Sequence, residues 1–312
     1  MTDSVTPANP RGSALQFSIM LPVAKADRKL VHGDYHFGRS LARALERRGH
    51  RTRLLAVEEW AQASGDDVTL YIRGRASARH RIGRISLAWC ISFFPKPGQT
   101  DYACIDHFFA ASPVLRNRIA RIAGKDRVSL MYQAFDRDLM YLDNGASAQD
   151  LVFVGTPRSE ARRPVVPYAA ASGLPFRLYG AGWESTPYSK FQAGGNVPND
   201  HLGDIYRGAS VIINDHLVVM RRLQIGSNRI YDALACGRPV LNDLDTGLPP
   251  DVQPFILPYA DADSFRKQAE VALSESADRL AERRAFAESM RDVHSFDQRA
   301  EQILSKVDDL EK

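Results

Sequence analysis

Short apolar runs alternate with amphipathic stretches along the first 135 residues of the chain. The apolar runs predict buried strands, which fall at residues 15–24, 51–57, 67–74, 85–92, 105–112 and 127–135. Between them, FGRSLARALERRGH places Leu41, Ala44 and Leu45 at helical spacing before Gly49, and PVLRNRIARIAG predicts a second helix. Strands that alternate with helices favour a parallel sheet covered by helices on both faces.

The same alternation restarts after residues 143–149. The predicted strands are 151–155, 176–180, 210–214 and 239–243, and the predicted helices are 159–172, 199–209, 228–236 and the charged segment from Asp261 onward. We therefore expect an α/β protein with two Rossmann-like, doubly wound lobes facing a cleft. The expected domains are a disordered leader (1–14), an N-terminal acceptor-side domain (15–145), a C-terminal nucleotide-sugar domain (146–292) and a helix that packs back towards the N-terminal domain (293–312).

Composition and cysteine content favour a folded, cytoplasmic protein. The chain has 44% hydrophobic and 25% charged residues, which is typical of globular proteins. No stretch approaches the roughly 20 apolar residues of a membrane span, and the first residues lack the pattern of a signal peptide. Cys90, Cys104 and Cys236 each lie in an apolar run, which suits reduced core thiols better than disulfides or a metal cluster.

The net charge of +4 is distributed unevenly along the chain. Residues 1–145 carry 22 Lys and Arg against 14 Asp and Glu, a net +8, whereas residues 146–312 carry 19 against 23, a net −4. The first half is therefore expected to meet an anionic partner, whether an acceptor, a membrane surface for peripheral contact or nucleic acid. Solvated surface arginines explain the asymmetry equally well.

The stretch SNRIYDALACG (227–237) carries the most chemical information. Ser227 suits an N-cap and Gly237 a C-terminal stop, so a helix is expected from about Asn228 to Cys236. Asn228 and Asp232 are four residues apart and share a polar face, near Arg229. An anionic group would meet the free N–H groups of this helix start and Arg229, and Asp232 could accept hydrogen bonds from sugar hydroxyls. A solvated acid with Arg229 as its local partner is the alternative.

Several motifs in this order resemble the GT-B glycosyltransferases, particularly the CgeB-like group with a carboxyl domain of the "glycosyl transferases group 1" type. The motifs span almost the whole chain: HGDYHFGRSLARALERRGHR, FVGTPRSEARRP, FRLYGAGWE, DIYRGASVIINDH, SNRIYDALACGRPVLND and VHSFDQRAEQIL. The resemblance implies two Rossmann-like lobes, a nucleotide-diphosphate-sugar donor held mainly by the second lobe and an acceptor on the first, with no cofactor and no metal at the diphosphate.

The resemblance also assigns roles in the donor site. Asp232 matches the acid that contacts the donor ribose, the YGAGW loop matches the loop that lines the nucleotide pocket, and Val197 matches the position beside the base. Asn228 and Arg229 would lie by the diphosphate, where positive charge stabilises the departing nucleotide. The complete set of donor-site residues is Gly180, Trp183, Val197, Asn214, Ser227, Asn228, Arg229 and Asp232.

One departure from the family pattern concerns the reaction's stereochemistry. Many retaining GT-B enzymes carry two glutamates eight positions apart, and here these positions hold Gln224 and Asp232. Gln224 supplies no carboxylate, so retention of configuration is in doubt. Asp215 or His216 could face the sugar instead, and His216 is a candidate catalytic residue.

In the first half, VHGDYHFG lies between a strand and a helix. Gly33 would permit a tight turn on the acceptor side, and the side chains beside it would face the cleft. An inverting transferase needs a general base that takes the proton of the acceptor hydroxyl, and Asp34 and His36 are the catalytic candidates, with His32 beside them. A capping role for Asp34 and structural roles for the histidines are the alternative.

Two further features of the first half remain open between function and structure. The arginine-rich LYIRGRASARHRIGR would attract a phosphorylated or carboxylated acceptor through Arg73 and its neighbours, or form a solvated loop. It has no interleaved aromatic residues, which disfavours nucleic-acid binding. Trp89, Phe93 and Phe94 would stack on a sugar or fill the core, and core filling is the favoured interpretation.

We therefore expect a cytoplasmic, metal-independent glycosyltransferase that moves a sugar from a nucleotide-diphosphate-sugar to an acceptor hydroxyl. A nucleotide-sugar epimerase of the same fold is one alternative. A non-catalytic nucleotide-sugar-binding or assembly protein is the other.

Overall fold

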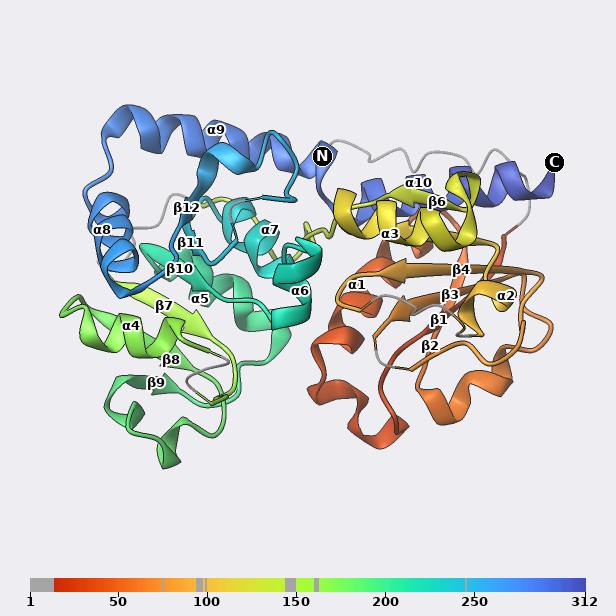
Figure 1. Cartoon of the computed structure of the whole chain (residues 1–312), viewed down its shortest axis with the longest axis horizontal. Coiled ribbons are helices and arrows are strands. Elements are labelled where there is room, and N and C mark those ends of the chain that lie inside the picture. Colours follow the sequence, from red (N-terminus) through yellow and green to blue (C-terminus); the bar gives the residue numbers. More distant parts are fainter. Residues whose placement is uncertain are drawn as a thin grey trace, which may run out of the picture. The chain divides into compact units, whose positions relative to one another are not determined.

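The computed structural model describes residues 14–74, 76–93, 98, 100–143, 150–159, 163–244 and 246–312, and the chain folds into two compact units. Unit 1 comprises residues 1–132 and 296–312, and unit 2 comprises residues 133–295 (Figure 1). The chain changes units between residues 132 and 133, whereas the expected boundary lay between 145 and 146. Only part of the segment expected to form a strand at 127–135 does so. Phe135 instead forms an isolated bridge with Ser295 in unit 2. The expected leader lies outside the described residues, apart from Ala14.

Unit 1 contains one parallel sheet with the strand order β2-β1-β3-β4-β5-β6. Its strands are β1 (Gln16–Met20), β2 (Arg51–Leu55), β3 (Val68–Arg73), β4 (Ile85–Cys90), β5 (His107–Ala110) and β6 (Val128–Leu130). Its helices are α1 (Gly33–Glu46), α2 (Asp101–Cys104), α3 (Pro113–Ala123), α10 (Phe296–Glu311) and the 3-10 helices Ala26–Val31, Val57–Ala63 and Lys125–Arg127. Every residue of β3, β4 and β5 is buried, as expected for strands of a covered parallel sheet.

The C-terminal helix α10 packs against α1 in unit 1. The Phe296 ring lies 4.8 Å from the Phe37 ring, and Asp297 forms ion pairs with Arg47 and Arg48. Trp89 is fully buried and donates its indole N–H to the Met131 carbonyl at 3.0 Å, so this ring fills the core and is not free to stack on a sugar. Phe94 lies outside the described residues.

Unit 2 contains a second parallel sheet with the order β12-β11-β10-β7-β8-β9. Its strands are β7 (Leu151–Val154), β8 (Phe176–Tyr179), β9 (Gln192–Gly194), β10 (Val211–Asn214), β11 (Val240–Asn242) and β12 (Ile256–Pro258). The hydrophobic pattern misses β9 and β12. Both are three-residue edge strands, QAG and ILP, and neither forms an apolar run long enough to predict a strand.

Helices cover both faces of the second sheet. They are α4 (Val165–Ala171), α5 (Leu202–Gly208), α6 (Val218–Leu223), α7 (Asn228–Ala235), α8 (Ala262–Leu273) and α9 (Ala277–Val293), with 3-10 helices at Trp183–Ser185, Ser189–Phe191, Asn199–His201 and Gln253–Phe255. α4 packs with α8, while α7 packs with α5 and α9. α4 tolerates Pro164 and Pro167 because they occupy the N-cap and first turn, where no backbone N–H is needed.

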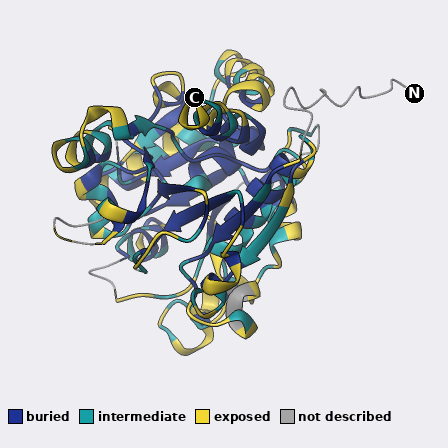
Figure 2. Ribbon diagram, turned by 90° about the vertical axis from the view of Figure 1, so that its right-hand side faces the viewer, coloured by how far each residue is buried: buried dark blue, intermediate teal, exposed yellow. Residues whose placement is uncertain are grey.

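Burial follows this layered arrangement. Figure 2 shows buried strands in dark blue beneath helices whose outer surfaces are exposed. In unit 2 the core joins residues of β7, β8, β10, α4 and α8, including Phe153, Trp183 and Phe265. No helix in the described part of the chain combines the length and the apolar character that a bilayer span requires.

Candidate functional site

The carboxyl ends of β7 and β10 form the topological switch point of unit 2. The strand order of this unit is the order of the dinucleotide-binding Rossmann fold, in which the first and fourth strands are neighbours and the crossover direction reverses between them. Here those strands are β7 and β10, which pair through Val211 and Leu151. Ligands of open α/β sheets bind beyond the strand ends at this point. The loops that follow Val154 and Asn214 are therefore the first place to examine.

Asn214, the last residue of β10, connects the elements around the switch point. It is fully buried, and its amide N–H donates to Asn242 at the end of β11 over 2.6 Å. Its side-chain oxygen accepts hydrogen bonds from the Ser227 hydroxyl and the Arg229 guanidinium. Asn214 thus belongs to the expected donor site, but as a buried support rather than as a surface for the donor.

Two arginines converge on the Phe153 ring at the end of β7. The guanidinium carbons of Arg229 and Arg163 lie 5.0 and 4.7 Å from the ring centroid. Arg229 donates to the Val154 carbonyl at 2.7 Å, and its Nε is buried without a hydrogen-bond partner among the described residues. Arg163 pairs with Asp215 at 3.1 Å; burial lowers its pKa to about 10, Asp215 opposes the shift, and Arg158 and Arg229 add to it. Positive charge is therefore concentrated at the switch point.

The first turn of α7 is left without a side-chain cap. Ser227 occupies the N-cap position, but its hydroxyl donates to Asn214 at 3.2 Å instead of accepting from the helix. Its own N–H donates to His216 Nε2 at 2.9 Å, and the Ile230 N–H donates back to the Ser227 carbonyl. The N–H groups of Asn228 and Arg229 lie in the first turn, where a helix offers them no acceptor, and they have no partner among the described residues. They can therefore donate to an external acceptor. An uncapped helix start beside Arg229 is suited to an anion.

His216 supports this helix start and is not exposed to a substrate. It is 2% exposed, and its Nδ1 lies 2.6 Å from an oxygen of Asp243, which follows β11. Because a carboxylate only accepts, Nδ1 carries the proton and Nε2 accepts from Ser227. The interpretation of His216 as a catalytic group facing the sugar is therefore corrected: both ring nitrogens are engaged, and the residue positions α7.

Asp215, the other candidate to face the donor sugar, is also buried. It is 5% exposed, and one of its oxygens pairs with Arg163 while the other is buried with no partner in the part of the chain that the structure describes. Asp243 and Arg163 are among the site residues that were not anticipated from the sequence. The signal for Asp243 was present, because Asn242 ends a buried strand and Asp243 directly follows it at the carboxyl edge of the sheet.

Asp232 pairs with Asn228 on α7, as their spacing predicts. The Asn228 amide donates to Asp232 at 3.0 Å. The polar face of the helix is itself covered, however, and Asp232 is only 5% exposed. Burial raises its pKa well above the usual range, the nearby Asp136 raises it further, and Arg229 opposes the shift. The carboxyl group is thus held in a low-dielectric position one turn from the uncapped amides.

The loop after β8 packs closely against the loop after β7. Gly180 has a φ of 135°, and a Cβ there would lie 2.2 Å from the Gly155 carbonyl oxygen, so this position requires glycine. Trp183 is 2% exposed and donates its indole N–H to that same oxygen at 2.6 Å. Both residues pack against Gly155 and thereby determine the shape of the loops at the switch point. Val197, in the loop after β9, is partly exposed and remains available to a ligand.

Gln224 is the one non-glycine residue with a positive φ in the described part of the chain. It ends α6 with φ 52° and ψ 42°, the left-handed region. A residue of this size in that region marks local strain, which often accompanies function. It occupies the position that the resemblance compared with a glutamate of retaining GT-B enzymes, and the hydrophobic pattern gave no indication of its backbone conformation.

In unit 1, Asp34 and His36 lie in the first turn of α1, which follows β1. Burial raises the pKa of Asp34, and the nearby His32 partly offsets this shift. His36 Nε2 lies 2.9 Å from the Leu30 carbonyl and therefore donates to it. Residues two apart on a helix do not face the same point, so the two side chains do not act as a pair.

Gly33 and Arg73 differ from their expected acceptor-side roles. Gly33 has no positive φ, and a Cβ there would meet no atom within 4 Å, so no tight turn requires glycine. Arg73 is 3% exposed and forms a buried ion pair with Asp101, Nε to Oδ1 at 2.9 Å. It also donates to the carbonyls of Gly74 and Ala76. These partners occupy the guanidinium, and Arg73 holds a loop together instead of binding an acceptor.

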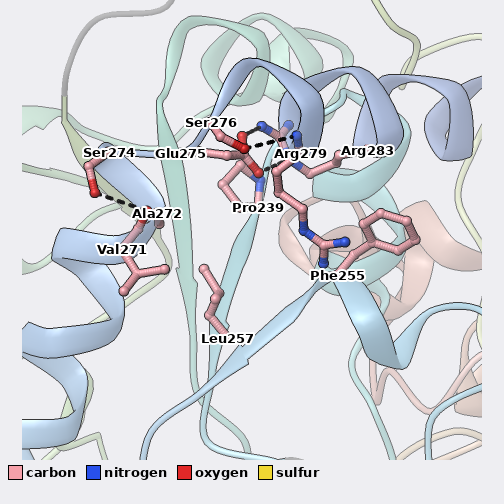
Figure 3. A pocket seen from close by; sticks show the side chains of 10 residues that line it. All are labelled: Pro239, Phe255, Leu257, Val271, Ala272, Ser274, Glu275, Ser276, Arg279 and Arg283. Carbon is pink, nitrogen blue, oxygen red and sulfur yellow. Dashed lines mark hydrogen bonds and ion pairs between the residues drawn. The ribbon is translucent and has the colours of Figure 1, made fainter.

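A pocket elsewhere in unit 2 does not belong to this site. Figure 3 shows it between α8, the start of α9 and β12. Its volume is about 290 Å³. It lies at the amino ends of the strands, since Pro239 precedes β11 and Phe255 precedes β12. Arg283 is paired with Glu275, and Arg279 is hydrogen-bonded to the Pro254 carbonyl. The pocket therefore offers no free charge to a ligand.

The sequence and the fold match known glycosyltransferases. A family model described as "Glycosyl transferase-like" matches residues 158–305. The fold is similar to that of AviGT4, a glycosyltransferase involved in avilamycin A biosynthesis, at 18% identity over 94% of this chain and 97% of that chain, with a TM-score of 0.66. It is also similar to Anabaena Alr3699/HepE in complex with UDP and glucose, at 9% identity over 95% and 100% of the chains, with a TM-score of 0.62.

A third similar structure is an α-glucosyltransferase in complex with UDP and a 13-mer DNA, at 9% identity over 95% and 99% of the chains, with a TM-score of 0.65. No sequence among curated proteins matches significantly. The two parallel sheets with flanking helices and a C-terminal helix confirm the expected two-lobed GT-B architecture. Assignment to the CgeB-like group stays a prediction.

Proposed function

We propose that this glycosyltransferase of the GT-B fold transfers a sugar from a uridine-diphosphate sugar to an acceptor hydroxyl. The single observation that carries the proposal is the uncapped start of α7, with free N–H groups at Asn228 and Arg229 and the Arg229 guanidinium at the switch point. Uridine is chosen because similar structures contain UDP or UDP-glucose.

In this proposal unit 2 binds the donor without a metal ion. The two phosphate groups of the donor accept hydrogen bonds from the α7 amides, and Arg229, with Arg163 beside the same Phe153 ring, balances their charge. Asp232 accepts hydrogen bonds from the ribose hydroxyls, Val197 lies beside the base and Gln224 lies near the sugar. The three free, buried cysteines support the expected cytoplasmic location.

Asp34 of unit 1 is the proposed general base. The acceptor oxygen attacks the anomeric carbon of the donor sugar, and the proton of the acceptor hydroxyl passes to the Asp34 carboxylate. The bond between the anomeric carbon and the diphosphate oxygen breaks, and UDP leaves with the electron pair. The charge that develops on the leaving oxygen is stabilised by Arg229 and the α7 amides. This single displacement inverts the configuration of the sugar.

The diphosphate site is tested by replacing Arg229. We expect Arg229→Met to weaken UDP binding by about 1.5 to 3 kcal/mol, the range for hydrogen bonds to charged groups, and Arg229→Lys to weaken it less. Uridine, which has no phosphates, should bind the variants and the native protein equally. Titration calorimetry with and without EDTA measures both ligands, and the chelator should change nothing.

Arg222→Met is the matched control, because Arg222 is an exposed cation on α6 with no described partner. Its UDP affinity should equal that of the native protein. Equal losses in the Arg222 and Arg229 variants, or unchanged UDP affinity in Arg229→Met, would reject the diphosphate site. Release of UDP from UDP-glucose separates transfer or hydrolysis from epimerisation, which releases no nucleotide.

The ribose contact is tested by Asp232→Ala. We expect this change to weaken uridine and UDP binding by the same amount, about 1 to 3 kcal/mol, because it acts on the nucleoside and not on the phosphates. Burial and Asp136 favour the protonated form by raising the Asp232 pKa. Uridine affinity should therefore rise with pH as Asp232 ionises and gains acceptor capacity, and this rise should be absent from the variant. Uridine affinity that is identical in both proteins at every pH would exclude the role.

A further inference from the structure

The charge asymmetry of the sequence maps onto the two structural units. Unit 1 carries 24 Lys and Arg against 16 Asp and Glu, a net +8, and unit 2 carries 17 against 21, a net −4. In the arginine-rich loop around Arg73, Arg73 is buried with Asp101, Arg81 and Arg84 form ion pairs, and only Arg79 is exposed without an ion pair among the described residues. A denser group of cations without ion pairs lies elsewhere on unit 1 and forms a positive surface.

A groove on α3 supplies such a surface. It has a volume of about 630 Å³ and lies beside β6, the edge strand of the sheet. Its lining residues are Arg116, Asn117, Ala120, Arg121, Lys125 and Val128. The lining contains three cations and no acid. Within the described residues, Arg121 and Lys125 are exposed and form no ion pair, and Arg116 donates hydrogen bonds to the Asn117 amide oxygen.

The groove leads towards the edge of the sheet where ligands of this fold bind. α3 begins at Pro113, directly after the carboxyl end of β5, and Arg116 is one turn further along. The helix is about 16 Å long at 1.5 Å per residue. A chain bound along it from Lys125 to Arg116 would therefore reach the carboxyl edge of the unit 1 sheet, which is the edge that also presents the start of α1.

We propose that this groove binds an acidic glycan, a carboxylate- or phosphate-bearing sugar chain that serves as the acceptor; the identification as acceptor rests on the proposed function. Three cations in a lining that contains no acid attract anionic groups. Asn117 adds an amide that can bond hydroxyls, and the aliphatic Ala120 and Val128 offer surfaces for sugar C–H groups. No aromatic ring lines the groove to stack bases, which disfavours single-stranded nucleic acid. A concave surface also fits a chain better than a planar bilayer.

The test compares two double variants of the full chain that change the net charge equally. Arg121→Glu with Lys125→Glu alters the groove, and Lys267→Glu with Arg291→Glu alters two exposed cations of unit 2. The probes are a labelled oligogalacturonate, a neutral dextran oligomer, a DNA duplex and phosphatidylserine-containing vesicles. UDP binding is measured in parallel.

We expect the native protein to bind oligogalacturonate more tightly than the other three probes, and more weakly as salt is raised. The groove variant should lose about tenfold or more of this affinity, because two attractive charges become repulsive, whereas the control variant should stay within about twofold. UDP binding should be unchanged in both variants. If the native protein binds no UDP, the proposed function fails, whatever the glycan result.

Equal oligogalacturonate affinity in the groove and control variants would overturn the groove as the binding surface. Tighter binding of the duplex or of the vesicles than of oligogalacturonate would overturn the acidic glycan as its occupant. Equal binding of dextran and oligogalacturonate would show that charge does not drive the interaction, and would also reject the proposal.

Discussion

Replacing Asp34 by asparagine is expected to lower kcat for sugar transfer by about a hundredfold to ten-thousandfold, the usual contribution of a general base. The substitution keeps the shape of the side chain and removes its ability to take a proton. UDP affinity should not change, because the proposed donor site lies wholly in unit 2. The rate is measured as UDP release from UDP-glucose with a panel of sugar acceptors.

The dependence of the rate on pH gives a second test of Asp34. A general base acts only when it is ionised, so kcat/KM falls as the pH drops through its pKa. Burial raises the pKa of Asp34 above the ordinary value for aspartate, although His32 opposes the shift. The acid limb of the profile should therefore lie at higher pH than for a free aspartate, and it should be absent from the residual activity of Asp34→Asn.

Two comparison variants sharpen this test. Asp126→Asn changes an exposed acid of the same unit and should leave kcat unaltered. His36→Asn should have a smaller effect than Asp34→Asn, because His36 Nε2 is already bonded to the Leu30 carbonyl. If Asp34→Asn retains native kcat and the native acid limb, another group is the base, and a larger loss in His36→Asn would identify it.

The second large effect concerns stability. Asp101→Ala should lower the free energy of unfolding by about 3 to 5 kcal/mol, because it leaves the Arg73 charge buried without its counterion. Arg73 and Asp101 are 3% and 1% exposed, and Asp101 also accepts a hydrogen bond from the Ala78 N–H. Denaturant titration measures the change. Since both residues lie in unit 1, UDP binding by unit 2 should persist at low denaturant.

An exposed ion pair provides the contrast. Arg266 and Glu270 pair on α8 with side chains 63% and 51% exposed, so Glu270→Ala should cost no more than about 0.5 kcal/mol. The double variant Arg73→Met with Asp101→Leu should regain most of the lost stability, since it removes both charges together. A loss in Asp101→Ala no larger than that in Glu270→Ala would show that the buried pair contributes little.

Local patterns predicted most of the fold. The apolar runs located ten of the twelve strands in the described residues, and the predicted helix from about Asn228 to Cys236 is α7, Asn228–Ala235. These signals come from residues within a few positions of one another. The short edge strands β9 and β12 were missed because a strand of three residues is stabilised by its neighbour in the sheet rather than by its own apolar pattern.

Local patterns also predicted part of the candidate site. The Asn228 and Asp232 pairing follows directly from helical spacing. Helical spacing does not predict that the first N–H groups of α7 are free. Ser227 is a residue type that usually caps a helix start, so the sequence predicts a capped helix. Its hydroxyl turns instead to Asn214, thirteen positions earlier, which only the arrangement of β10 against α7 allows.

The sequence by itself determined the two α/β units, the order of their elements, the charge asymmetry and the polar face of α7. Periodicity and capping depend on residues close together in the chain, and net charge is a sum over residues. Tertiary structure alone decided which polar groups are left for a ligand. His216 meets Asp243 from 27 positions away and Arg73 meets Asp101 from 28, so both lose the roles their types suggested. A polar side chain's function depends on whether a distant partner has already satisfied it, and chain folding supplies that partner.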